Sequence, residues 1–393
     1  MTAKITILRT RVTWAFVPLF LASCQPETPV SAVLVQWSAD RDLRIGSLNA
    51  RDYILTEVAD LAVGRDGTIY VAQPQEQTIR VYDSTGTFLR TIGREGGGPG
   101  EFYRPIRLGW KADTLWVRDP AAQRMSMFAA DGTFITSISF PVLLHSLYLD
   151  WVGPSYLLAD GTVLSVPHVR TRAVADGSVT HLPWLRLSRE GEVLDTLLRQ
   201  SMLHTTAQVH DPLGRGRQYI RQRFSDAPLV DLAPDGSELV VVDRRVDARD
   251  PTYTVTALSP AGDTILHRGY RYSPVPFDQE AQESWIAEFV ERRRRLGLLT
   301  PTLERALRRA VYVPEHTVPV TALVAGRDGT TWLRGPETDP GLASWTVLGT
   351  DGTKLASIDI PTGVRVYQAD RNFIWGIEHD TLDVPYVVRL RVR

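Results

Sequence analysis

The 393-residue sequence lacks most of the features that identify enzymes and nucleic-acid-binding proteins. It has a single cysteine, and it contains neither a GxSxG elbow nor an HExxH motif, so two common hydrolase arrangements are absent. Its charge is balanced, with 44 Lys and Arg against 45 Asp and Glu, which gives no indication of a nucleic-acid partner. Apolar residues nevertheless make up 43% of the chain, and this amount is sufficient for a sizeable core.

The one cysteine follows a short apolar run. Residues 12–22 are uncharged, follow basic residues and are too few to span a bilayer, which indicates a signal peptide over residues 1–23. The run ends in Leu-Ala-Ser-Cys, which resembles the lipobox of bacterial lipoproteins. The resemblance implies that Cys24 is lipidated and holds the chain to a membrane through a tether over residues 24–32. Gln25 in place of aspartate implies the outer membrane of a Gram-negative cell envelope; an ordinary secretory peptide is the alternative.

Turn dipeptides recur along the rest of the chain. Asp-Gly between alternating β-forming residues is a strong hairpin signal, because glycine accepts the positive φ of a tight turn. The ten turns of this kind are Asp66-Gly67, Thr85-Gly86, Asp113-Thr114, Asp131-Gly132, Asp160-Gly161, Glu190-Gly191, Asp235-Gly236, Ala261-Gly262, Asp328-Gly329 and Asp351-Gly352. They predict antiparallel hairpins in which each strand buries one face.

Pairs of these turns define four-stranded units. Six units begin at Glu57, Tyr103, Leu147, Ala227, Thr317 and Val364, and in the third the segment 156–166 can pair in two ways. A unit of about 40 to 50 residues cannot bury its faces alone, so the sequence predicts an all-β fold, a closed six-bladed β-propeller over residues 33–393. The sixth unit has only three strands, and we expect residues 32–37 to supply the fourth and close the ring.

The first unit also carries a family resemblance. Residues 58–105 combine a hydrophobic strand, Asp-Gly, Ile-Tyr-Val, a polar loop, Arg-Val-Tyr-Asp, a second turn and Gly-Pro-Gly-Glu-Phe before a proline. This order resembles an NHL-type repeat, and the pattern returns in the second and fifth units. The resemblance implies a six-bladed propeller of the NHL-repeat or TolB-like type. It implies no substrate, since such propellers include binding modules, lyases and lactonases.

The two ends of the predicted propeller differ. In antiparallel blades the Asp-Gly turns share one rim, which is uniform, and the remaining connections share the opposite rim, where they are long and irregular. We therefore expect the loop-rich rim to be the binding face. The longest connection, about residues 278–311, predicts a helical hairpin between the fourth and fifth blades, with helices beginning at Asp278 and at Thr300. The hairpin either covers the junction of these blades or forms a lid or partner surface beside the channel.

Candidate ligand-binding residues lie near the entries to inner strands. They are Glu101, Arg104, His145, Arg223 and His316. The glycine-rich segment that contains Glu101 lacks the Gly-Lys-Ser/Thr ending of a phosphate loop and leads into a strand, so we interpret it as a blade connection. The eight histidines are scattered, but ligands for a divalent metal could converge from different blades, with His145 and His316 as candidates.

These observations predict a lipid-anchored cell-envelope propeller that binds a peptide, protein or small-molecule ligand through its loop-rich rim, without a catalytic motif, a cofactor or nucleic acid. The alternative is a metal-assisted propeller enzyme of the lyase or lactonase type, with a divalent metal in the central channel. Asparagine occurs only at Asn49 and Asn372, which argues against lactonase-like ligands. Four tryptophans are interpreted as core residues rather than as sugar-stacking platforms: Trp110, Trp116, Trp332 and Trp375.

Overall fold

The structure is a computed structural model, and it describes residues 34–139, 149–151, 153–210, 217–247, 249–295, 297, 299–337, 339 and 341–393. The predicted signal peptide, the predicted lipidation site Cys24, the predicted tether and His145 lie outside the described residues. Residues 34–393 cluster into one unit. None of the helices in the described part of the chain is long and apolar enough to cross a membrane.

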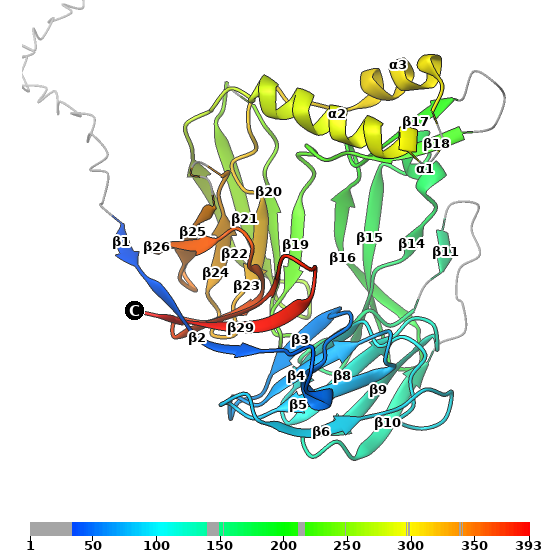
Figure 1. Cartoon of the computed structure of the whole chain (residues 1–393), viewed down its shortest axis with the longest axis vertical. Helices are drawn as coiled ribbons and strands as arrows, with labels where there is room; N and C mark the ends of the chain where they lie inside the picture. Colours follow the sequence, from blue (N-terminus) through cyan, green and yellow to red (C-terminus); the bar gives the residue numbers. More distant parts are fainter. Residues whose placement is uncertain are drawn as a thin grey trace, which may run out of the picture. The chain divides into compact units, whose positions relative to one another are not determined.

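Six blades follow one another along the described part of the chain, five of them with four strands and the fifth with five, which confirms the predicted six-bladed β-propeller (Figure 1). Blades one to three contain β3 (Asp60–Val63), β4 (Ile69–Gln73), β5 (Thr78–Tyr82) and β6 (Phe88–Ile92); β7 (Arg107–Lys111), β8 (Thr114–Asp119), β9 (Arg124–Ala129) and β10 (Phe134–Ser139); and β12 (Tyr156–Leu157), β13 (Val163–Ser165), β15 (His181–Leu187) and β16 (Val193–Ser201). Blades four to six contain β19 (Leu229–Leu232), β20 (Leu239–Asp243), β21 (Thr252–Leu258) and β22 (Thr264–Arg271); β23 (Ala322–Ala325), β24 (Thr331–Arg334), β25 (Leu342–Leu348) and β26 (Lys354–Pro361); and β27 (Arg365–Ala369), β28 (Phe373–His379) and β29 (Pro385–Val392) with β2 (Ala39–Ile45).

The third blade differs from its predicted start. Its inner strand begins at Tyr156, which pairs with Leu164, and not at Leu147. The nearby strand β11 (Leu149–Trp151) pairs instead with β14 (His168–Val169) in a separate two-stranded sheet. The inner strand of this blade therefore has only two residues, Tyr156 and Leu157.

The N-terminal strands close the ring, but not with the segment that was predicted. β2 is antiparallel to β29 and supplies the fourth strand of blade six. Residues 35–37 form β1 (Val35–Trp37), which runs parallel to β26 as a fifth strand of blade five. Ile45 of β2 is 2% exposed in the core shared by blades six and one, whereas Val35 is 61% exposed. The predicted closure is therefore confirmed, and the predicted segment is wrong, because β2 and not β1 pairs with β29 and places Ile45 in the core.

The Asp-Gly turns have the conformation that their sequence requires. The glycines of nine of the ten turns have φ between 73° and 92°, and in the turn at Asp113 the preceding Ala112 has φ 49°. In most turns the aspartate accepts hydrogen bonds from a Thr or Ser two residues later, as Asp66 does from the N–H (3.0 Å) and hydroxyl (2.8 Å) of Thr68. The backbone N–H of Thr68 in this turn lowers the pKa of Asp66. The turns are thus fixed by local hydrogen bonds.

Neighbouring blades pack on one another through shared apolar cores. Inner strands of successive blades contact each other around the ring, as β3 does β7 and β27 does β3. Blades three and four share a core that includes Leu158, Trp184, Leu232 and Leu258. Of the tryptophans interpreted as core residues, Trp116, Trp332 and Trp375 are at most 3% exposed. Trp110 is half-buried and packs against the core of blades one and two, so it lies at the edge of that core.

Two insertions on the loop-rich rim pack against each other. The predicted helical hairpin is present as α2 (Gln279–Arg295) and α3 (Pro301–Ala310), and Thr300 caps α3 by accepting the N–H of Leu303. The connection from blade three to blade four contributes the hairpin of β17 (Thr206–His210) and β18 (Arg217–Arg221), and the loop before β15 contributes α1 (Thr171–Ala175). The two insertions form a small core of their own, in which Val209, Ile220, Leu303 and Leu307 are buried. The helical insertion therefore reaches beyond the junction of blades four and five.

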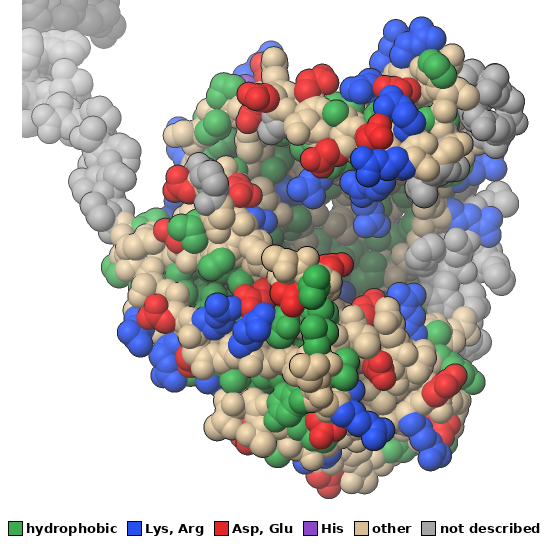
Figure 2. All heavy atoms as spheres, viewed as in Figure 1, with side chains coloured by type: hydrophobic (Ala, Val, Ile, Leu, Met, Phe, Trp, Pro, Cys, Tyr) green, Lys and Arg blue, Asp and Glu red, His purple; other side chains and the backbone are tan. Residues whose placement is uncertain are grey.

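Arginine side chains gather over the helical insertion, with acidic side chains among them (Figure 2). Arg292–Arg295 end α2, but Arg294 pairs with Glu291 (2.7 Å) and with Glu304 of α3 (2.8 Å). Arg308 of α3 also pairs with Glu304 (3.3 Å). These pairs indicate that the basic run is a solvated helix face rather than a surface for anionic lipid.

Candidate functional site

Among the cavities that the described residues surround, three lie at the waist and at the two rims of the propeller. A cavity of about 60 Å³, here called the channel waist, is lined by inner-strand residues from all six blades. A cavity of about 320 Å³, the Asp-Gly-mouth cavity, lies among the first turns of blades one, two, four and five. A cavity of about 470 Å³, the loop-mouth cavity, lies on the loop-rich rim between blades four and five. Both rims of the ring therefore offer space for a ligand.

The channel waist is occupied by charged side chains. Nη1 of Arg107 in blade two donates to the hydroxyl of Tyr156 in blade three (2.7 Å), and its guanidinium lies over the Tyr156 ring. Asp60 and Asp231 interact with the charge of Arg107 from blades one and four. Burial raises the pKa of each carboxyl to about 6, although Arg107 and backbone N–H donors oppose the shift.

The two aspartates of the waist have a structural function. Asp60 accepts the N–H of Leu108 in the next inner strand (2.9 Å), and Asp231 accepts the N–H of Ala325 in the next inner strand (2.9 Å). Each carboxyl therefore satisfies a backbone donor of the neighbouring blade. A space of about 60 Å³ has room for only a few water molecules, so the waist is a constriction and not a ligand site.

The loop-mouth cavity takes its walls from three parts of the chain. They are the connection into blade four, the loops that follow β20 and β24, and both ends of the helical insertion. The residues that determine its chemistry are Arg223, Phe224, Arg244, Phe277, Thr317 and Arg334. Figure 2 shows the surface hollowed beneath the helical insertion. The insertion thus borders the cavity, as the prediction of a lid or partner surface required.

Aromatic side chains form one wall of the loop-mouth cavity. The Phe224 ring meets the rings of Phe277 (4.8 Å between centroids) and Trp285 (5.3 Å) edge to face. Trp285 belongs to α2 and stacks on Phe289 of the same helix (5.2 Å). Such edge-to-face contacts fix ring positions as well as burying area. The wall therefore ties the helical insertion to the connection that enters blade four.

A buried arginine holds the loops of this cavity together. Arg244 follows β20, is 8% exposed, and donates to the carbonyl oxygens of Ser225 (2.9 Å), Ala227 (2.8 Å) and Val320 (2.7 Å). Burial lowers the pKa of Arg244 to about 10, so it is still charged at neutral pH. The guanidinium N–H groups of Arg244 are bonded to backbone carbonyl oxygens. Arg244 therefore contributes positive potential to the cavity but no free donor.

Two more arginines border the same cavity. Arg223 is exposed, and Arg334 lies 3.9 Å from Glu337 with 30% of its side chain accessible. An exposed guanidinium beside an aromatic wall can bind an anionic group while the wall receives an apolar one. The arrangement suits a ligand that carries both.

The predicted ligand-binding residues are not brought together as a group. Arg223 lines the loop-mouth cavity, and His316 is adjacent in sequence to Thr317, which also lines it. Nδ1 of His316 is buried and has no hydrogen-bond partner among the described residues. Glu101 and Arg104 lie in the connection between blades one and two and line none of the three cavities.

Glu101 and Arg104 instead stabilise their own connection. Glu101 accepts the N–H of Gly98 (2.7 Å) and Nε of Arg94 (2.9 Å), and the Gly98 donor lowers the pKa of Glu101. The N–H of Arg104 donates to Asp119 (3.0 Å), while the Arg104 side chain is exposed. The glycine-rich segment is therefore a blade connection, as interpreted, and no phosphate loop.

Within the described ranges no three His, Cys, Asp or Glu side chains converge as ligands for a metal ion. His145, a predicted metal candidate, lies outside those ranges. The sequence interpretation missed Arg244, Phe277 and Arg334, because long-range contacts bring them to the cavity. It also missed Asp60 and Asp231, for which an aspartate within an apolar inner strand was a usable signal.

Comparison with known proteins agrees with the fold. Residues 47–150 match the family model DUF5128, described as a 6-bladed beta-propeller. No curated protein is similar enough to this chain to be matched. Similar solved structures include a member of the DUF4221 family from Bacteroides vulgatus, with 12% identity over 91% of this chain and 98% of that one and a TM-score of 0.49.

Two further solved structures show the breadth of the similarity. One is described as an exported protein from Bacteroides fragilis, with 9% identity, 91% of this chain and 99% of that one covered, and a TM-score of 0.43. Another is virginiamycin B lyase from Staphylococcus aureus, with 10% identity, 90% and 99% covered, and a TM-score of 0.41. At these levels the comparison carries no information on activity, so the function has to be argued from the site.

Proposed function

We propose that the protein is a lipid-anchored binding protein of the cell envelope, and that it binds its ligand in the loop-mouth cavity of the propeller. The observation that carries this proposal is the combination, in one cavity of about 470 Å³, of an aromatic wall and the exposed guanidinium group of Arg223. The volume is in the range of sites for small molecules or for a few residues of a peptide. The ligand is an apolar group joined to an anion, such as the C-terminal end of a peptide.

Two features favour binding over a purely structural cavity. Arg244 holds three loops in place through backbone carbonyl groups, so the walls are formed before a ligand enters. Arg223 is exposed at the edge of these fixed walls. A preformed cavity with an exposed cation loses little entropy when it takes an anionic ligand.

A fluorescent probe with the same chemistry tests the proposal. Anilinonaphthalene sulfonate combines an aromatic body with an anion and brightens in an apolar site. We expect one saturable site on the folded protein, and about tenfold weaker binding in Arg223→Ala, because a charge-assisted contact is lost. Arg104→Ala is the matched control, since Arg104 is also exposed but lines no described cavity, and it should bind as the wild type does.

Peptides then define the natural ligand class. Pairs with free and amidated C-termini should differ in displacing the probe, and the free carboxylate should compete better. Equal loss of probe binding in Arg223→Ala and Arg104→Ala would contradict the assignment to this cavity. Circular dichroism of each variant separates this result from unfolding, which also increases probe fluorescence.

The lipid anchor rests on the Leu-Ala-Ser-Cys sequence and needs its own test. The full-length chain expressed in a Gram-negative host should incorporate labelled palmitate and sediment with outer membranes. Cys24→Ser should abolish both, because the thiol that carries the lipid is removed. Labelling that persists in Cys24→Ser would contradict lipidation at this residue.

A further inference from the structure

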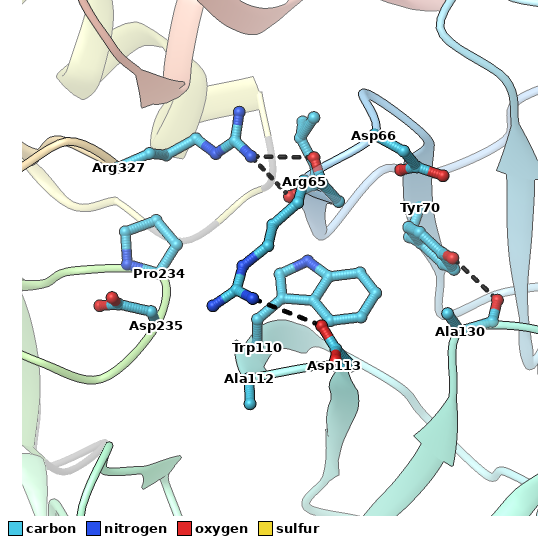
Figure 3. A pocket seen from close by; sticks show the side chains of 12 residues that line it. Arg65, Asp66, Tyr70, Trp110, Ala112, Asp113, Ala130, Pro234, Asp235 and Arg327 are labelled. Carbon is cyan, nitrogen blue, oxygen red and sulfur yellow. Dashed lines mark hydrogen bonds and ion pairs between the residues drawn. The ribbon is translucent and has the colours of Figure 1, made fainter.

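The Asp-Gly-mouth cavity lies on the rim opposite the loops. It is lined by the first turns of blades one, two, four and five, with Trp110 and Tyr70 behind them (Figure 3). Its volume of about 320 Å³ is at the lower end of the range for small-ligand sites. The loop-mouth cavity shares none of these residues, so the two cavities are independent.

The walls of this cavity are fixed by hydrogen bonds between blades that are not neighbours. The N–H of Trp110 in blade two donates to the carbonyl of Pro234 in blade four (2.9 Å). Nη2 of Arg327 in blade five donates to the carbonyl oxygens of Val63 (3.1 Å) and Gly64 (2.9 Å) in blade one. Because four blades are joined around it, the cavity is preformed and a ligand has little to reorganise.

An indole lies at the centre of the cavity. Trp110 is half-buried, and its ring meets the ring of Tyr70 at 5.1 Å and 79°. Tyr70 is itself held in place by a hydrogen bond from its hydroxyl to the carbonyl of Ala130 (2.9 Å). Figure 3 shows the Trp110 indole between Pro234 and Asp235 on one side and Tyr70 on the other. A fixed indole offers a flat apolar surface on which the C–H face of a ring can stack.

Charged groups of both signs surround the indole. Arg65 and Asp113 face each other across the mouth at 3.5 Å, and Arg327 lies 3.4 Å from Asp370. Asp235 adds a further carboxylate to the lining. A cationic ligand would meet Arg65 and Arg327, and an anionic ligand would meet Asp113 and Asp235. A neutral ligand with several hydroxyl groups can donate to the carboxylates and accept from the guanidinium groups at once.

We infer that the Asp-Gly-mouth cavity binds a neutral saccharide unit. One face of the sugar ring stacks on Trp110, and its hydroxyl groups bond to Arg65, Asp113 and Asp235. The Arg65–Asp113 pair has 80% and 86% of its side chains exposed, so opening it for a sugar costs little. The protein then has two sites, one on each rim, for ligands of different chemistry.

Saturation-transfer NMR on the full-length protein, in a detergent without a sugar headgroup, tests this site. The probes are the neutral disaccharides maltose, cellobiose and N,N′-diacetylchitobiose at millimolar concentration. We expect transfer to the ring protons of at least one sugar. Trp110→Ala should weaken its binding about tenfold, because an aromatic residue at the centre of a site dominates the contact. Trp110→Phe, which keeps a ring in place, should retain part of the affinity.

Matched variants separate this site from the loop-mouth cavity. Trp285→Ala removes another half-buried tryptophan, beside the loop-mouth cavity, and should leave sugar binding unchanged. Asp235→Asn keeps the side-chain acceptor for the N–H of Ser237 and should weaken sugar binding only a few-fold. Because the sugar is neutral, its affinity should not depend on salt concentration. Absence of transfer from all three sugars, or equal binding by wild type and Trp110→Ala, would overturn the inference. Sulfonate binding at the loop mouth should persist in Trp110→Ala, so failure of one proposal is distinguishable from failure of the other.

Discussion

The two mouths of the channel are made from the same six blades, but the single turns of one and the loops of the other are held in shape in different ways. Long-range hydrogen bonds such as that from Trp110 to Pro234 join the turns of the Asp-Gly mouth to one another, whereas the shape of each turn is set locally. At the Asp-Gly mouth, the side chain of Asp66 is bonded to Thr68, two residues away. At the loop mouth, Arg244 is bonded to the carbonyl of Val320, 76 residues away. The contact within the turn needs only residues that are close in sequence, whereas the contact of Arg244 forms only when the blades have assembled. The turns of the Asp-Gly mouth are therefore alike from blade to blade, whereas the loops of the loop mouth differ from one another.

The largest expected effect compares one glycine on each rim. Gly236 at the Asp-Gly mouth and Gly177 on the loop-rich rim have similar φ values of 73° and 77°. A Cβ at Gly236 would lie 2.4 Å from the carbonyl oxygen of Leu157, whereas one at Gly177 would meet nothing within 4 Å. In urea unfolding, Gly236→Ala should lose about 4 kcal/mol and Gly177→Ala about 1 kcal/mol, the latter from backbone strain alone. Similar losses would show that the turn is not wedged against blade three.

Removal of Arg244 should have the next largest effect. Arg244→Ala leaves the carbonyl groups of Ser225, Ala227 and Val320 without their buried donor, and we expect a loss of about 3 kcal/mol in the free energy of unfolding. Arg244→Lys keeps the charge but has fewer directions in which to donate, and should recover part of the loss. A loss below about 1 kcal/mol in Arg244→Ala would mean that the loop mouth does not depend on this residue.

The carboxyl groups of the waist and of the turns should respond to pH in opposite directions. Asp60 has a pKa of about 6 in the fold and 3.8 as the ordinary value, so the folded state binds its proton more strongly between these values. Its contribution to stability is therefore present at low pH and is lost as the pH rises from 4 to 6. Over this range the free energy of unfolding of the wild type should fall by about 1 kcal/mol relative to that of Asp60→Asn. This value includes a reduction for screening by water in the channel.

Asp66 gives the opposite case, because its turn lowers the pKa. Its contribution to stability is present above pH 4 and is lost as the pH falls below that value. Thermal unfolding of wild type, Asp60→Asn and Asp66→Asn at a series of pH values measures both. Parallel pH profiles for the two variants would contradict the difference between waist and rim.

The smallest expected effect concerns a single turn. Asp66→Ala removes the acceptor for the N–H and hydroxyl of Thr68, and should cost about 1 kcal/mol of unfolding free energy. Asp235→Asn keeps an acceptor for Ser237 and should be close to neutral. A loss from Asp66→Ala as large as that from Arg244→Ala would remove the distinction between local and long-range support.

This distinction also explains which features the sequence predicts. The turns and the number of blades follow from Asp-Gly pairs and alternating strands, because the responsible hydrogen bonds are local. The closing strand was misplaced by a few residues, since Ala39–Ile45 and Val35–Trp37 can both pair as strands and only burial decides between them. The glycine-rich segment with Glu101 was correctly read as a connection.

The site residues were harder to predict for the same reason. Arg223 was found because it precedes an inner strand, but Arg244 and Phe277 meet in the loop-mouth cavity only through the long-range packing of blades four and five. Trp110 occupies a position typical of the core and packs against it, but it is half-buried and also lines the Asp-Gly-mouth cavity. No local sequence pattern indicates that Arg244 and Phe277 line a cavity or that Trp110 is partly exposed.

The most direct test asks which rim is protected by a ligand of the loop mouth. Hydrogen exchange of the backbone amides, measured with and without anilinonaphthalene sulfonate, reports on both rims in one experiment. We predict slower exchange in residues 223–227, 317–321 and 333–337, which surround the loop-mouth cavity, and no change in the turns at 64–68 and 112–114. Protection of the turns without protection of the loops would contradict the account.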